Sequence, residues 1–169
     1  MSAMHDYYRA PDRATATWRP DRLRAPAEPL PGAPVFDVVD TKWIDPQVAI
    51  GELVALIGKV PYSDELVKTV VLYPPPDGAP TTDVEVEALP RDSPYLVGPQ
   101  IEELPVRVRD VLAGFDDARL PDVARRWLTE DPSDNPYERE TRELVEGLVA
   151  LARRAKESGQ LLYCWSIAG

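Results

Sequence analysis

The last third of the chain, residues 135–169, constrains the fold more than any other stretch. Apolar residues recur there at alternating steps of four and three, which places them on one face of a helix. Asn135 and Pro136 suit its first turn, and Gly159 suits the residue just after its end. The predicted helix face consists of Tyr137, Thr141, Leu144, Leu148, Leu151 and Ala155, widened by Val145, Val149 and Ala152.

A strand is predicted directly after this helix, over residues 161–167. Apart from Ser166, the stretch is apolar on both of its alternating faces. A strand at the edge of a sheet, or one with a solvated face, alternates between apolar and polar residues. We therefore expect residues 161–167 to form a central strand of a sheet. Cys164 lies within it and is expected to be a buried, unreactive thiol.

The charge of the chain is concentrated in its larger part. Residues 1–34 contain five arginines and four acids, net +1, so residues 35–169 carry 14 basic and 25 acidic residues, net −11. Such a surface repels nucleic acids and anionic membranes, and it favours a basic protein as partner. The first residues lack a secretion signal and no apolar run reaches about 20 residues, so we expect a cytoplasmic protein.

Two regions are predicted: a proline-rich N-terminal arm, residues 1–34, and an acidic globular domain, residues 35–169. Prolines in the arm exclude a long helix. The arm nevertheless contains Tyr7, Tyr8 and Trp18, large aromatic residues that flexible linkers usually lack. Either these side chains pack the arm against the domain, or they bind a partner protein. We favour the first alternative, because buried aromatic side chains usually stabilise packing within a protein.

The domain is predicted to be a single α+β unit. Its sheet is mostly antiparallel, with helices packed on one face, and the C-terminal helix is followed by the central apolar strand. Helices are expected after Asp45-Pro46, from Pro105 and after Asp116-Asp117. Strands are expected at residues 35–39, 69–73, 82–88 and 95–97, with 82–88 antiparallel to 69–73.

No catalytic or metal-binding pattern emerges from the residues. His5 is the only histidine, it is expected in a mobile terminus, and no cysteine spacing suits zinc. Phosphate-binding loops, nucleophile elbows and dinucleotide glycine triplets do not occur. We therefore predict no catalytic residues, no metal and no cofactor.

Candidate interface residues lie instead on acidic and proline-rich stretches. One face of the predicted strand over residues 82–88 consists of Asp83, Glu85 and Glu87. This acidic face is either exposed to solvent or bound by a basic partner. The preceding loop contains Pro75 and Asp77, and its prolines reduce the entropy that docking would cost.

Several blocks of the chain resemble a group of small, acidic, uncharacterised proteins common in actinobacteria. Asp6-Tyr7-Tyr8-Arg9-Ala10-Pro11 and Lys42-Trp43-Ile44-Asp45-Pro46 carry the resemblance, together with the blocks 51–56, 120–127, 148–155 and 162–165. The resemblance covers most of the chain, and it implies no reaction and no catalytic residue. Some such proteins look like immunity partners of secreted toxins.

Three functional hypotheses follow. The first is a cytoplasmic immunity protein, or antitoxin, that neutralises a toxin by occluding its active site; an NAD-cleaving enzyme or a nuclease would suit an acidic inhibitor. The second is a small enzyme or ligand-binding protein with a carboxylate-lined pocket. The third is a structural subunit that its N-terminal arm holds in an assembly.

Overall fold

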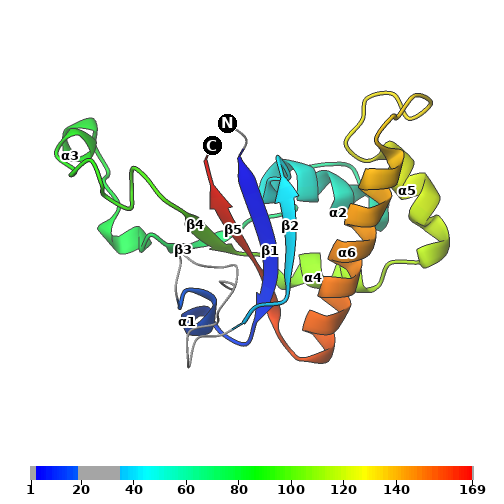
Figure 1. Ribbon diagram of the computed structural model, residues 1–169, viewed down its shortest axis with the longest axis horizontal. Helices are drawn as coiled ribbons and strands as arrows, with labels where there is room; N and C mark the ends of the chain where they lie inside the picture. The colour runs from blue at the N-terminus through cyan, green and yellow to red at the C-terminus, as the bar shows by residue number, and fades with distance from the viewer. Residues whose placement is uncertain (1–2, 19–34, 169) are drawn as a thin grey trace.

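The computed structural model describes residues 3–18 and 35–168. Its centre is a five-stranded sheet in the order β2-β1-β5-β4-β3, and every neighbouring pair is antiparallel (Figure 1). This confirms the predicted α+β fold and the central position of β5. The strands are β1 (Met4–Ala10), β2 (Val38–Lys42), β3 (Val70–Tyr73), β4 (Gln100–Glu103) and β5 (Leu161–Ile167).

Four helices, α2, α4, α5 and α6, lie together on one side of this sheet (Figure 1). The longest is α6 (Glu138–Glu157), and Gly159 after it adopts the left-handed conformation predicted for that position, with φ 66°. The other helical segments are α1 (Arg13–Ala16), the π-helical turn Pro46–Ile50, α2 (Gly51–Gly58), the 3₁₀ turn Pro76–Gly78, α3 (Asp83–Glu87), α4 (Val106–Ala113), the 3₁₀ turn Asp117–Arg119 and α5 (Leu120–Arg126).

The main core lies between these helices and the sheet. Trp127 is fully buried in it, and its Nε1 donates a hydrogen bond to the Ala49 carbonyl oxygen at 2.8 Å. Cys164 points into the same core, where burial raises the pKa of its thiol well above the usual value, so it fits the inert thiol expected there. Other buried members of this core include Leu53, Val108, Leu112, Val145, Leu148, Leu151 and Leu162.

The opposite face of the sheet carries a second, smaller core. Tyr8, Ile101, Tyr163 and Trp165 form it together with Ala16 of α1. The Tyr8 hydroxyl donates to the Ala16 carbonyl oxygen at 2.7 Å and so fastens α1 against the strands. Because both faces of β5 are covered, its two-sided apolar sequence is explained by its position.

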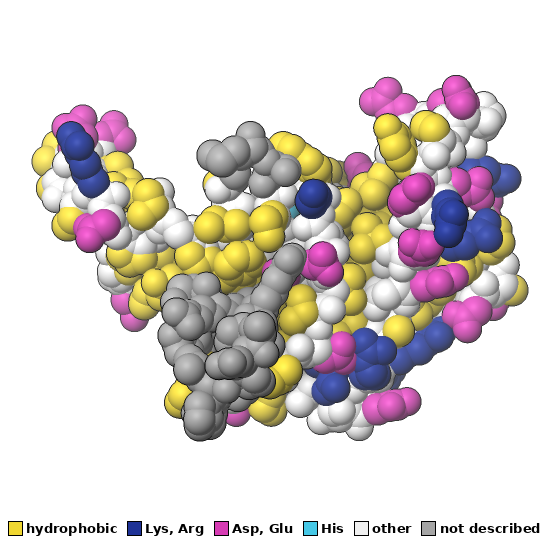
Figure 2. All heavy atoms as spheres, viewed as in Figure 1, with side chains coloured by type: hydrophobic (Ala, Val, Ile, Leu, Met, Phe, Trp, Pro, Cys, Tyr) yellow, Lys and Arg dark blue, Asp and Glu magenta, His cyan; other side chains and the backbone are white. Residues whose placement is uncertain are grey.

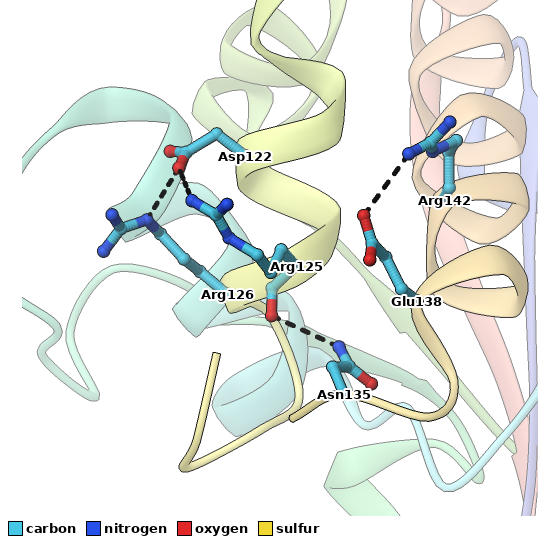
Figure 3. Close-up of polar contacts among 6 residues, drawn as sticks. All are labelled: Asp122, Arg125, Arg126, Asn135, Glu138 and Arg142. Atoms are coloured by element: carbon cyan, nitrogen blue, oxygen red, sulfur yellow. Dashed lines mark hydrogen bonds and ion pairs between the residues drawn. The ribbon is translucent and has the colours of Figure 1, made fainter. Parts of the chain in front are cut away.

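The start of α6 differs in detail from the prediction. The helix begins at Glu138, and Tyr137 rather than Asn135 occupies the capping position. Figure 3 shows the Asn135 amide turned towards α5, where its Nδ2 donates to the Arg125 carbonyl oxygen at 3.2 Å. Its Oδ1 accepts from the Tyr137 amide at 3.0 Å. Asn135 therefore ties the α5–α6 connection to the end of α5.

The N-terminal segment is the largest correction to the predicted organisation. Residues 4–10, expected in an arm, form strand β1, which lies between β2 and β5. Its sequence does not look like an inner strand because polar residues occur on both faces, including the fully buried Asp6. The sheet therefore crosses the predicted boundary at residue 34, and residues 19–34 of the expected arm lie outside the described residues.

Two of the predicted strands are wrong. Residues 83–87 form helix α3, capped by Thr82, whose hydroxyl accepts from the Glu85 amide at 3.2 Å. Residues 95–97 lie in turns, and the strand that pairs with β3 is β4, just beyond Gly98-Pro99. Alternation over seven residues is too short to exclude a helix, and here a capping threonine with acids in the first turn favours one.

Candidate functional site

The connection between β3 and β4, residues 74–99, projects from the sheet and is here named the β3–β4 arm. Figure 1 shows it leaving the edge of the sheet and carrying α3 at its far end. It contains seven prolines in 26 residues, which restrict its backbone. Among the helices and strands described, none packs extensively against α3.

Internal contacts give the β3–β4 arm a defined conformation. The Tyr95 hydroxyl donates to the Pro75 carbonyl oxygen and so joins the outgoing and returning halves of the arm. Gly78 permits this approach, since a Cβ atom at that position would collide with the same hydroxyl. The Glu85 carboxylate accepts from the Thr81 amide at 2.6 Å and from its hydroxyl at 3.0 Å. These bonds lower the pKa of Glu85.

The surface of the arm combines exposed aliphatic groups with acids. Of its side chains only Ser93 is buried, while Val84, Leu96 and Val97 are 75%, 46% and 53% exposed. Five acids and one arginine give residues 74–99 a net charge of −4. Figure 2 shows acidic side chains at the tip of the arm, where it stands away from the body. Exposed aliphatic groups with an acidic rim are typical of a protein-binding surface.

Five of the sequence-predicted interface residues lie on this arm: Pro75, Asp77, Asp83, Glu85 and Glu87. The acids at 83, 85 and 87 are exposed on a short helix instead of on a sheet face. Glu85 is tied to Thr81, whereas Asp83 and Glu87 are four residues apart and therefore share a side of the helix. The structure thus joins the two predicted acidic and proline-rich stretches into one projecting element.

The aromatic candidates Tyr7 and Tyr8 require correction. Both side chains are buried, Tyr7 in the main core and Tyr8 in the second core, so neither is accessible to a partner. Their burial supports the alternative that these aromatic side chains pack within their own protein. Trp18, at the end of the described N-terminal segment, is 58% exposed.

A polar cavity that the sequence did not reveal lies at the edge of the sheet where β1 begins and β5 ends. Strand register aligns Thr41, His5, Ser166 and Gln100 across β2, β1, β5 and β4. Residues directly opposite each other on antiparallel strands share a face. His5, Ser166 and Gln100 line a cavity of about 530 Å³ with the acids Asp45, Asp64, Glu65 and Glu102.

His5 is therefore part of a sheet and not of a mobile terminus. Burial lowers the pKa of its imidazole, against the opposing effect of the carboxylates of Asp45, Glu102 and Asp6. Its Nδ1 is buried without a hydrogen-bond partner among the described residues. The Thr69 hydroxyl donates to Glu102 Oε1 at 2.6 Å and orients that carboxylate. This cavity depends on register between distant strands, and no local motif indicates it.

Within residues 3–18 and 35–168, no group of three or more His, Cys, Asp or Glu residues is arranged to hold a metal ion. In the same part of the chain no helix combines the length and apolarity that crossing a membrane requires.

Comparisons of this chain with family models, curated proteins and solved structures gave no significant match. The β3–β4 arm and the polar cavity are therefore the two features from which a function can be inferred.

Proposed function

We propose that this protein is a non-enzymatic binding module, an immunity protein or antitoxin that neutralises a basic toxin by inserting the β3–β4 arm into its active site. The observation that carries the proposal is the arm itself: a structured, acidic projection on which Val84, Leu96 and Val97 remain about half exposed or more. The proposed setting is the cytoplasm.

The physical character of the arm suits occlusion of an active site. Its prolines and the Tyr95–Pro75 hydrogen bond restrict its conformation before binding, so less entropy is lost on docking. Enzymes that bind NAD or nucleic acids attract phosphate groups with basic clefts, and an acidic projection complements such clefts. Val84 and Leu96 supply apolar area that association would remove from water.

The first experiment is to identify the partner. The tagged protein serves as bait for proteins encoded beside it, and the activity of each captured protein is measured free and in complex. A basic enzyme whose activity disappears in a stoichiometric complex is the expected result. A captured partner that remains fully active in the complex would contradict occlusion.

The contribution of the arm is then measured by charge reversal. The variant combines Asp77→Lys, Asp83→Lys and Glu87→Lys. Glu85 is left unchanged because its carboxylate accepts hydrogen bonds from the Thr81 amide and hydroxyl. We expect association at low salt to slow by about tenfold or more, and the difference to shrink as salt increases. The matched control reverses the exposed acids Glu130, Asp134 and Glu157, with the same change in net charge. Equal slowing in both variants would show that only net charge matters.

The polar cavity at His5 favours one alternative, a small enzyme or ligand-binding protein with a carboxylate-lined pocket. The third hypothesis, a structural subunit held by its N-terminal arm, cannot be tested by deleting residues 1–34, because that deletion would remove β1 from the middle of the sheet. A deletion that tests this hypothesis must therefore leave β1 (Met4–Ala10) in place and start at Pro11.

A further inference from the structure

Two neighbouring hollows meet at His5, Ser166 and Gln100. The first is the polar cavity of about 530 Å³. The second, of about 550 Å³, shares these three residues and extends towards the base of the β3–β4 arm, where Val71, Leu96 and Val97 line it. Together they form a cleft with an acidic half and an apolar half, and the row of polar residues from β1, β5 and β4 separates the two.

The acidic half has an excess of negative charge. Four carboxylates line it, those of Asp45, Asp64, Glu65 and Glu102, whereas Lys68 is the one lysine or arginine that the described residues contribute to its lining. The Lys68 ammonium already forms an ion pair with Glu65 at 2.6 Å. Asp45 accepts from two backbone amides at the start of the π-helical turn. Glu102 accepts one hydrogen bond from the Thr69 hydroxyl, which leaves further acceptor sites on its carboxylate, and Asp64 adds an exposed carboxylate to the lining.

The residues at the junction of the two halves also offer hydrogen-bond acceptors. A hydroxyl at Ser166 and an amide oxygen at Gln100 accept hydrogen bonds, and a neutral imidazole at His5 has one acceptor nitrogen. A guanidinium group has five N–H donors in a plane, and an ammonium group has three. The aliphatic stem of either side chain packs favourably against an apolar surface.

We propose that this cleft binds the guanidinium or ammonium group of an arginine or lysine side chain that the partner protein presents, with its stem in the apolar half. The inference rests on the proposed function in one respect: the partner is the protein that the β3–β4 arm binds. Pro94, Leu96 and Val97 of the arm form part of the cleft, so a protein held by the arm lies beside its opening.

The cleft can be tested without the partner because His5 is the only histidine in the sequence. The two C–H resonances of its imidazole are followed by NMR while N-acetyl-arginine methylamide is added to the tag-free protein at pH 7.5. We expect a saturable shift with this probe, and none with the citrulline analogue, which has the same length but no charge. A linear, non-saturating response, or an equal response to citrulline, would overturn the proposal.

Variants locate the binding and connect it to the partner. Glu102→Gln combined with Asp64→Asn keeps the side-chain shapes, and we expect roughly tenfold weaker binding of both the arginine probe and the captured partner. The control Glu157→Gln removes an exposed charge at the end of α6 and should change neither. Unfolding midpoints of all variants are compared to exclude a general loss of structure.

The outcomes separate this inference from the proposed function. If charge reversal on the arm weakens partner binding but the cleft variant does not, the inference is overturned and the arm remains the binding element. If the arginine probe binds but no partner is inhibited, the proposed function fails. The assignment of the cleft to a partner side chain then fails with it, because the cation would have to come from a free small molecule.

Discussion

Replacing the β3–β4 arm by a short turn should leave the domain folded and nearly as stable as before. In this variant about four residues with an Asn-Gly turn connect Tyr73 to Gln100 directly, in place of residues 74–99. Shortening the connection from 26 to about four residues reduces the cost of loop closure by (3/2)RT ln(26/4), which is roughly 1.7 kcal/mol.

The loss of contacts opposes this gain. Leu96 and Val97 are about half exposed, so their removal costs roughly 1 kcal/mol each if full burial is worth about 1.5–3 kcal/mol. Val84 and the acids of α3 are exposed and contribute little. The two effects nearly cancel, and we expect the free energy of unfolding to change by less than about 1 kcal/mol.

Urea denaturation followed by tryptophan fluorescence measures this change. Trp127 and Trp165 are both buried in the cores and remain in the variant. Binding of the partner should be lost in the same variant. A decrease of more than about 3 kcal/mol in the free energy of unfolding would refute the reasoning, because it would mean that the arm is an integral part of the fold.

Three further predictions concern single side chains. Tyr95→Phe removes the hydrogen bond to Pro75 that joins the two halves of the arm, so partner binding should weaken severalfold in calorimetry while the unfolding midpoint stays unchanged. Trp127→Phe should lower the free energy of unfolding by roughly 2–4 kcal/mol in urea, because the Ala49 carbonyl loses its buried donor and a smaller ring leaves a void; an unchanged midpoint would contradict this. Since burial lowers the pKa of His5, the unfolded chain takes up the proton first, and stability should fall as the pH decreases from about 6.5 towards the folded pKa. His5→Asn should abolish that dependence between pH 7.5 and 5.5; a parallel decrease in both proteins would assign it to other groups.

The end of the chain was predictable because its signals are local and agree with each other. The helix face, the glycine after the helix and the two-sided apolar strand all occur within residues 135–169. Strand β1 was missed because its polar residues occupy both faces: His5 and Arg9 on one, Asp6 on the other. An inner strand with buried polar groups depends on partners far away in the sequence.

The candidate site was predictable in its composition but not in its geometry. The sequence identified the acids and prolines of residues 75–87, yet it placed the acids Asp83, Glu85 and Glu87 on a sheet face, where the structure has a short helix. Their projection from the body follows from the pairing of β3 with β4, which brings Tyr73 opposite Ile101. The cleft at His5 depends on the same kind of long-range register, since Ser166 and Gln100 reach it from strands distant along the chain.

The pairing of β1 with β5 has a consequence for biogenesis. β5 stands between β1 and β4, so it joins the β2–β1 pair to the β4–β3 pair, and of these five strands it is synthesised last. Until residues 161–167 are synthesised, both pairs present an unpaired edge, and Tyr8 and Ile101 lack the neighbours that bury them. A nascent chain in that state is prone to aggregation, and one truncated before Leu161 would remain so. Only chains synthesised through β5 can therefore complete this sheet.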